Sequence, residues 1–524
     1  MAATTPLAVL DSMVREELPA ASIETLNITD PLYSLVKTTT DGVKSGGIGR
    51  GWNIMHRFHS GVSGLYEPST VTGGTIRNDA LRVDIRNTPT GFPNPSETPH
   101  ISHYVRQAFL HGHRGNYAVE EFDLKVESLD AAVLEKWATD IRGVAKLIAH
   151  TETVSFYVGN YIGCAPATTP EVSGGVATTY TTSKGGGATA NASLKIYPSL
   201  SRMAYWRSGM YVDIYDDSSL SHKRNVLTGT TTDVPLVVDV VDPVGDASGP
   251  FVIVTSVEGR ALNATSVFYN DEAIIHATTD NYVVPRGGTS SLKAGHYGLS
   301  DWVINSGTLF GDGDVWDMSR NTKTQALDVG DYPEFKSMIT TNLAAPLTET
   351  ILNQKIAGFV DAFQSQLDTI FTTLGVTMKM MESPNSGTSR LDYDRTGKSL
   401  AATFGFQPLK YEWEGRSITW HSSQFMPIGT LYALKLGGGN IKRYVPPRTS
   451  PQIGLSAPGT MEGLTGEIEF IAPMSGHPTI FLQVRNSSGR VLPQLEAPFW
   501  QFSNILPEDP RAVKIAGITE AALT

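Results

Sequence analysis

The chain is 524 residues long, enough for about three structural units, and carries 41 Lys and Arg against 52 Asp and Glu, a formal net charge of −11. This acidic balance argues against a protein that grips nucleic acid through a basic face, but not against one that encloses nucleic acid without holding it. The 19 Phe, 19 Tyr and 8 Trp exclude a disordered chain, and the single cysteine, Cys164, excludes internal disulfides and zinc sites built on paired thiolates.

Membrane and targeting signals are not found. No run of the sequence approaches the roughly 18 apolar residues that a membrane helix needs, and no apolar segment of the signal-peptide kind follows Met1. We therefore expect no membrane span and no secretory signal, and we expect Cys164 to be a small buried hydrophobe.

Residues 1–50 are predicted to form an N-terminal arm. Residues 11–18 suit a short helix that Pro19 stops, and residues 38–51 are polar and rich in glycine. Such a segment cannot close a core of its own, so we expect it to lie across another surface.

Residues 51–127 are predicted to form a long hairpin or flap. Leu81, Val83 and Ile85 alternate within residues 80–86, and residues 117–126 form a second extended piece. The Pro- and Gly-rich residues 87–99 lie between them. Because an isolated hairpin is marginally stable in water, this flap needs a partner surface.

The strongest helix prediction covers residues 128–157, with Ser128 as N-cap, and the Thr-, Gly- and Ala-rich residues 165–193 follow as a linker. One apolar stripe at helical spacing is expected to face the core: Val133, Trp137, Ile141, Val144 and Ile148.

From about residue 194 to 290 the pattern changes to short strands separated by turns, at 210–215, 236–241, 251–254 and 273–276. That spacing predicts a small β-sandwich or barrel.

The rest of the chain mixes both patterns. A second helix is predicted over residues 347–366, with Thr348 as N-cap, followed by a strand at 377–381. Further strands are predicted at 409–414, 416–420 and 430–435. The tail after residue 446 is rich in proline and contains one more β-like stretch, at 479–484.

Catalytic and cofactor motifs are almost entirely missing. The glycine string at 46–51 neither follows a predicted strand nor opens a helix, so it is not a dinucleotide fingerprint, and no Walker A, HExxH or GxSxG sequence occurs. Residues 312–317 place oxygen ligands at alternating positions but lack the distal Glu of a calcium loop, which favours a turn. We therefore expect no cofactor, no metal and no enzymatic activity.

Histidines and arginines gather in the predicted flap. Six of the 12 histidines lie between His56 and His113, including His59 and His111, and we expect them at a surface or interface, with a metal or pH-sensing role as the alternative. The arginines suit a subunit interface better than a nucleic-acid stripe, because Arg is enriched where proteins meet. They are Arg57, Arg77, Arg82, Arg86, Arg106 and Arg114.

The order of these elements resembles the major capsid protein of tailed bacteriophages, with the Hong Kong phage fold, also called the Johnson fold. An arm, a flap, one long helix, an α/β unit and a late β hairpin follow one another. Three runs look like that family: Leu200-Ser201-Arg202 leading to residues 209–214, residues 296–299 leading to 314–320, and Trp420 through Leu434.

The resemblance implies an α+β fold with named parts, which we state as expectations. They are an N-terminal arm (1–50), an extended loop (51–127), the spine helix of a peripheral domain with its linker (128–193), an inserted β domain (194–290), an axial domain (291–408), strands that return to the peripheral domain (409–445) and a C-terminal extension (446–524).

The resemblance also implies a function. Such a chain would assemble with itself, as hexamers and pentamers, into an icosahedral shell around double-stranded DNA in the virion, after assembly in the host cytoplasm. Scaffolding, portal and decoration proteins would be further partners.

Some family members crosslink their shells through a lysine on the extended loop. This sequence departs from that pattern, because it has no lysine between Lys44 and Lys125, and the insertion or tail is expected to reinforce the shell instead.

Other functions stay open. A bacterial encapsulin-type compartment is the alternative within the fold, and a β-rich binding or adhesion protein using residues 194–290 is the alternative outside it. A polysaccharide hydrolase with paired carboxylates ranks last, since nothing in the sequence sets the geometry of pairs such as Asp216/Asp217 and Asp392/Asp394.

Overall fold

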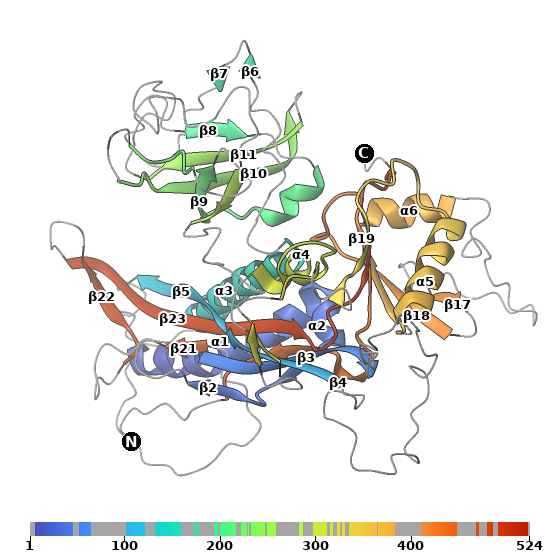
Figure 1. Ribbon diagram of the computed structural model, residues 1–524. Helices are drawn as coiled ribbons and strands as arrows, with labels where there is room; N and C mark the ends of the chain where they lie inside the picture. The colour runs from blue at the N-terminus through green and yellow to red at the C-terminus, as the bar shows by residue number, and fades with distance from the viewer. Residues whose placement is uncertain are drawn as a thin grey trace, which may run out of the picture.

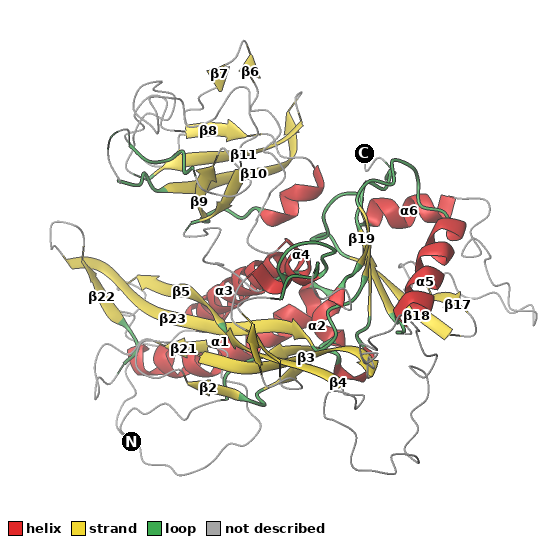
Figure 2. Cartoon of the chain, viewed as in Figure 1, coloured by secondary structure: helices red, strands yellow, loops and turns green. Residues whose placement is uncertain are grey.

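The protein is mixed α+β, with several sheets and few helices in its described part (Figure 1, Figure 2). A body of helices and two sheets lies at the centre, a third sheet stands above it in Figure 1, and a helix–sheet unit lies to its right. The computed structural model describes residues 6–45, 52–63, 101–120, 131–158, 172–173, 176–177, 193–196, 200–215, 222–227, 229, 232–246, 249–257, 282–286, 297–311, 315–317, 322–324, 327–330, 335–363, 365–382, 410–413, 416–447, 468–470, 479–485 and 491–521.

The N-terminal segment folds onto its own chain. Helix α1 (Pro6–Thr29) packs along α3 (Ala131–Val158), the 28-residue helix predicted from residue 128. Leu10, Val14 and Leu18 follow one another at intervals of four residues and are fully buried in the same cluster as the face of α3. The prediction of a short helix stopped by Pro19 was wrong. Losing one backbone hydrogen bond at the proline costs less than this continuous buried face gains.

Further contacts hold the same segment in place. Asp30 is the N-cap of α2 (Pro31–Leu35), and β1 (Lys37–Thr39) pairs in parallel with β20 (Ile441–Tyr444). The Asp11 carboxylate accepts a hydrogen bond of 2.9 Å from the Ile480 amide. The surface that the predicted arm needs is therefore supplied by the chain itself, over the described residues 6–45.

The first body sheet is organised by β23 (Val491–Pro507), the longest described strand. The strand β5 (His111–Glu120) pairs antiparallel along one stretch of it, and β20, β21 (Ile468–Phe470) and β22 (Leu482–Arg485) pair with it elsewhere. The C-terminal tail is thus the central strand of the body, where the sequence predicts an extension. Of the extended piece expected at 117–126, residues 117–120 lie in β5 and pair with β23, while residues 121–126 and 80–86 lie outside the described residues.

The second body sheet contains strands β3 and β4 of the predicted flap, whereas the later flap strand β5 lies in the first sheet. Its strand order is β14-β13-β4-β3-β2. The bounds are β2 (Val43–Ser45), β3 (Trp52–Ser63), β4 (Ile101–Phe109), β13 (Val315–Asp317) and β14 (Thr322–Thr324). Residues 315–317 of the candidate calcium loop therefore form a strand, and residues 312–314 lie outside the described residues. Three other features of the sequence also lie outside the described residues: the glycine string at 46–51, Ser128 and Cys164.

The third sheet is antiparallel and stands apart in Figure 1, with strand order β12-β9-β10-β11-β8. Within the described residues these strands form one layer, and the strand predicted at 273–276 lies outside those residues. The elements of this region are β6 (Val172–Ser173), β7 (Val176–Ala177), β8 (Ser193–Ile196), the 3-10 helix η3 (Leu200–Tyr205), β9 (Tyr211–Tyr215), β10 (Leu236–Asp246), β11 (Gly249–Ser256) and β12 (Tyr282–Pro285).

The helix–sheet unit packs α5 (Glu349–Phe363) and α6 (Leu374–Glu382) on a six-stranded sheet ordered β15-β24-β19-β16-β18-β17. As predicted, Thr348 caps α5, its hydroxyl accepting from the Ile351 amide at 3.3 Å. The strands are β15 (Met338–Thr340), β16 (Thr369–Thr372), β17 (Lys410–Trp413), β18 (Arg416–Ser422), β19 (Leu431–Leu434) and β24 (Val513–Ile515), and the short helices between the parts are α4 (Leu299–Trp302), η5 (Leu309–Gly311) and η8 (Gly437–Gly439).

Two predictions fail in this unit. Residues 377–381 are helical in α6, where Val376 and Met380, four residues apart, are both buried; the strand is β16, just before them. Residues 409–445 were expected to return as a group to the unit of the long helix. Strands β17, β18 and β19 instead pair in the sheet of β16, and only β20 joins β1 and β23 in the body.

A variant of α3 tests its buried stripe. Ile141 is fully buried between α1 and the β23 sheet, so Ile141→Asp places an unpaired charge in the core and is expected to cost about 3–5 kcal/mol of unfolding free energy. Leu147 on the same helix is 46% exposed, and Leu147→Asp is the matched control. Denaturant unfolding that shows equal effects for the two variants would contradict the assigned packing.

A glycine in β5 tests the role of the C-terminal strand. Gly115 lies opposite Phe499, and a Cβ atom built on Gly115 would stand 2.1 Å from Cζ of the Phe499 ring. Gly115→Ala is expected to destabilise the protein by about 1–3 kcal/mol through overpacking. In a Phe499→Ala background the ring is gone and the same change should cost far less, which a double-mutant cycle measures. An equal cost in both backgrounds would count against this pairing.

Candidate assembly surface

The β3–β4 ribbon is the candidate site for contact with other molecules. β2 pairs with residues 52–54 of β3 and β13 pairs with residues 104–106 of β4. Beyond these points, residues 59–63 and 101–103 pair only with each other among the described residues. Two-stranded ribbons are marginally stable in water, and within the described part of the chain this end of the ribbon has no third strand beside it.

The two faces of the ribbon differ in burial. Met55 is 55% exposed and Arg57 is exposed, while His56 between them is buried. Gln107, opposite Met55, is also exposed. The ribbon thus turns one face to the body and presents an apolar and a cationic side chain on the other.

His56 and Arg106 form the buried face. The Arg106 guanidinium carbon lies 3.8 Å from the centre of the Phe310 ring and 4.6 Å from that of Tyr297, and its Nε donates to His56 Nδ1 at 3.3 Å. His56 Nε2 donates to the Pro507 carbonyl at 2.8 Å. Burial, with the nearby Arg106 cation, lowers the pKa of His56 to about 3, so the ring is neutral. His56 therefore links the ribbon to β23.

The predicted interface arginines separate accordingly. Arg57 lies on the exposed face, but Arg106 is only 2% exposed and its assignment to a subunit interface was wrong, because its charge is held over two aromatic rings inside the chain. Arg114 lies on β5 opposite Trp500, with its side chain outside the described set. Arg77, Arg82 and Arg86 lie outside the described residues.

The stripe of α3 faces inward. Trp137, Ile141 and Ile148 are buried and Val133 and Val144 are partly buried, all in the cluster that includes α1, β5 and β23.

Within the described residues, no group of three His, Cys, Asp or Glu side chains could hold a metal ion. No helix in the described part of the chain is long and apolar enough to cross a membrane.

A buried ion pair behind this surface was missed by the sequence analysis. Arg443 on β20 donates to both Glu152 oxygens, at 2.5 and 2.9 Å, and Gln501 on β23 donates to Glu152 Oε2 at 2.7 Å. The three side chains join α3 to two strands of the body sheet. A signal was present in the sequence, because Glu152 lies four residues after Ile148 and so continues the apolar stripe with a charge.

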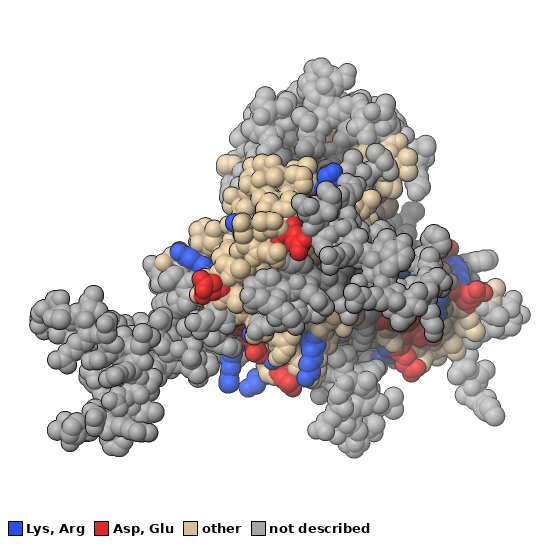
Figure 3. Space-filling model, turned by 90° about the vertical axis from the view of Figure 1, so that its right-hand side faces the viewer, with Lys and Arg blue, Asp and Glu red and all other residues tan. Residues whose placement is uncertain are grey.

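Other parts of the molecule also expose apolar side chains. Val244 in β10 is 87% exposed, Leu374 and Ile428 are exposed in the helix–sheet unit, and Trp500 is exposed on β23. Figure 3 shows Lys and Arg side chains interleaved with Asp and Glu over the lower part of one face, below the mostly uncharged described surface of the third sheet. Charges of both signs on one face suit specific contacts with a surface of similar composition.

Comparisons with known proteins bring two likenesses. No family model matches the chain, and no curated protein matches it in sequence. The structure is similar to the capsid asymmetric unit of cyanophage A-1(L), with 11% identity and a TM-score of 0.40, over 94% of this chain and 93% of the capsid chain.

The second likeness is more limited. The holo-SrpI encapsulin complex from Synechococcus elongatus PCC 7942 is matched at 11% identity and a TM-score of 0.20, over 36% of this chain and 55% of the encapsulin chain. Both TM-scores lie below 0.5, so the proposal below rests on the geometry of this chain together with its sequence resemblance.

Variants of the buried ion pair test its role. Arg443→Met removes the guanidinium that pairs with the buried Glu152 carboxylate, and we expect a loss of about 3–5 kcal/mol of unfolding free energy. The double variant Glu152→Leu/Arg443→Met removes both charges and should regain most of that loss. Lys442→Met removes the exposed pair of Lys442 with Glu508 on the same strand and serves as control, at under about 1 kcal/mol. A double variant no more stable than Arg443→Met would contradict this account.

Proposed function

We propose that this chain is a shell subunit that assembles with copies of itself, specifically the major capsid protein of a tailed bacteriophage. The observation that carries the proposal is the β3–β4 ribbon, which extends beyond its supporting strands and presents Met55 and Arg57 outward. An extended ribbon of this kind gains stability when another surface covers it. The family resemblance of the sequence assigns the same segment to contacts between subunits.

The distribution of exposed apolar side chains supports several interfaces per subunit. They occur on the ribbon, on β23, in the helix–sheet unit and on the third sheet, which are separate parts of the molecule. A closed shell of identical subunits needs heterologous contacts on several sides of each copy. Many weak contacts, each of μM quality or about −8 kcal/mol, together make such a shell persistent.

In this proposal the parts take the roles that the family resemblance implies. The α3 body is the peripheral domain, the helix–sheet unit is the axial domain and the third sheet is the insertion. Hexamers and pentamers of the chain enclose double-stranded DNA in the virion, after assembly in the host cytoplasm, and scaffolding, portal and decoration proteins are its further partners. The role is structural and non-catalytic. A net charge of −11 suits a wall along which packed DNA slides.

The encapsulin-type compartment is distinguished by its contents. Electron microscopy of purified particles, followed by nuclease digestion and extraction, shows whether they hold double-stranded DNA or a protein cargo. DNA-filled particles from infected cells support the capsid proposal. Shells that hold a cargo enzyme and no DNA would overturn it in favour of a compartment, and a chain that remains monomeric at high concentration would overturn both.

Substitutions on the outward face of the ribbon test the interface directly. Met55→Asp/Arg57→Asp replaces an apolar and a cationic side chain with carboxylates at exposed positions, so folding should be unchanged while assembly is lost. Light scattering and electron microscopy measure particle formation, and thermal unfolding of the unassembled chain checks the fold.

The control places a charge change elsewhere on the surface. Asp361→Lys alters an exposed position of α5 and is expected to leave both the fold and particle formation intact. Normal shells from the double variant would show that this face of the ribbon does not contact a neighbour.

A further inference from the structure

The Asp30 carboxylate joins three parts of the molecule at one buried point. It is 1% exposed, and its Oδ1 accepts hydrogen bonds from the Leu32 amide at 2.9 Å and from the Tyr157 hydroxyl at 2.8 Å. Its Oδ2 accepts from the Ser423 hydroxyl at 2.5 Å. Leu32 lies in α2, Tyr157 at the end of α3, and Ser423 in the loop after β18 of the helix–sheet unit.

No cation compensates this carboxylate among the described residues, and all three of its hydrogen-bond donors are uncharged. The titratable groups around the junction are Tyr157 and Glu152 on α3, Tyr33 on α2, His421 beside Ser423, and Arg443 on β20, whose guanidinium lies 6.0 Å from the Tyr33 ring. Arg443 is already paired with Glu152. Asp30 therefore differs from Glu152, which has a partner of opposite charge.

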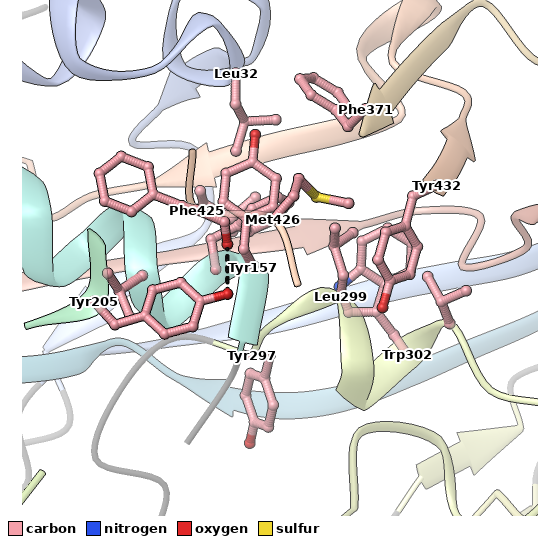
Figure 4. Packing of buried hydrophobic residues seen from close by; sticks show 14 of the residues in the cluster. Leu32, Tyr157, Tyr205, Tyr297, Leu299, Trp302, Phe371, Phe425, Met426 and Tyr432 are labelled. Carbon is pink, nitrogen blue, oxygen red and sulfur yellow. Dashed lines mark hydrogen bonds between the residues drawn. The ribbon is translucent and has the colours of Figure 1, made fainter. Parts of the chain in front are cut away.

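The loop of residues 423–426 is the side of this junction that belongs to the helix–sheet unit. Phe425 and Met426 are fully buried, and the Tyr205 hydroxyl donates to the Phe425 carbonyl at 3.1 Å. Figure 4 shows Phe425 and Met426 beside Tyr157, between Leu32 and Tyr205. When this loop is seated, it closes Asp30 off from water; when it withdraws, the carboxylate loses the Ser423 hydroxyl and regains solvent.

We propose that this junction is a proton-operated latch, in which seating of the 423–426 loop against α2 and α3 is coupled to uptake of a proton by Asp30. Acidification then holds the helix–sheet unit more firmly on the body, and neutral pH loosens it. When Asp30 is protonated, Ser423 Oγ accepts the new hydrogen bond in place of donating one, so the contact is kept.

The direction of the pH effect follows from linkage. Burial raises the pKa of Asp30 to about 6 from 3.8, because desolvation outweighs the three hydrogen bonds. A carboxyl whose pKa is higher when buried takes up a proton on docking. The stabilisation of the docked loop by this proton is therefore fully present below pH 3.8, the pKa of the carboxyl when it is exposed to water. It is lost as the pH rises through about 6, the pKa of the buried carboxyl. His56 and His150, with pKa values lowered to about 3 and 4, stay neutral across this window.

Hydrogen–deuterium exchange on the full chain tests the latch. After correction for intrinsic rates, amides of residues 423–430 are expected to open roughly tenfold more often at pH 7.5 than at pH 5. Asp30→Asn keeps an oxygen acceptor for Leu32 and Tyr157 and offers an amide to Ser423, but it cannot titrate, so the pH dependence should vanish. The control variant Asp361→Asn, at an exposed position of α5, should retain the pH dependence of the wild-type chain.

A second variant covers the case in which Asp30→Asn does not fold. Ser423→Ala removes one donor to the carboxylate, which should move the midpoint of the pH dependence upward. Exchange in this loop that does not depend on pH in the wild-type chain, a wild-type pH dependence in Asp30→Asn, or an unmoved midpoint in Ser423→Ala would each overturn the proposal. The measurement reports on one chain, so its outcome is separate from whether the chain forms a shell.

Discussion

The rest of the body depends on the pairing of β23 with strands from two distant regions of the chain, residues 111–120 and residues 441–485. This strand pairs with β5 from the flap region and with β20, β21 and β22 from later in the sequence. Its inward face carries Phe499 and Gln501, which contact the helices that lie on the sheet. Because β23 comes from the last part of the sequence, α1 and α3 have no complete sheet to cover until nearly the whole chain is present. Contacts so distant in sequence make folding slow and cooperative across the body.

Buried charge is handled in three ways around this sheet. Glu152 and Arg443 neutralise each other and join α3 to the strands. Arg106 has the faces of two aromatic rings and a neutral histidine as neighbours, which favours a buried cation. Asp30 has only neutral hydrogen-bond donors, so its cost of burial depends on pH. The first two arrangements fix the body, and the third lies where the body meets the helix–sheet unit.

The sequence predicts those elements whose pattern is set by local burial. The stripe of α3, the cap and stripe of α5, and the Val- and Ile-rich strands of the third sheet all follow periodicities that one segment carries alone. The sequence does not predict which elements of the chain pack or pair with one another. Nothing local shows that β5 pairs with β23, that α1 continues through Pro19, or that Arg106 turns inward. The prolines of β23 conceal it further: Pro498 stands between the residues paired with β22 and those paired with β21, where a missing amide hydrogen is tolerated.

These corrections change the argument for self-assembly. From the sequence, both the arm and the flap are expected to need a partner surface, so folding and assembly would be a single process. In the structure the described arm is part of the body, with Leu10, Val14 and Leu18 buried against α3, while the β3–β4 ribbon extends past the strands that pair with it in the described part of the chain. A subunit of this kind can fold first and assemble afterwards. In a shell of the proposed kind, individually weak and reversible contacts made by the ribbon would let the growing assembly correct its errors. The closed shell would then persist because one copy leaves only when all of its contacts break together.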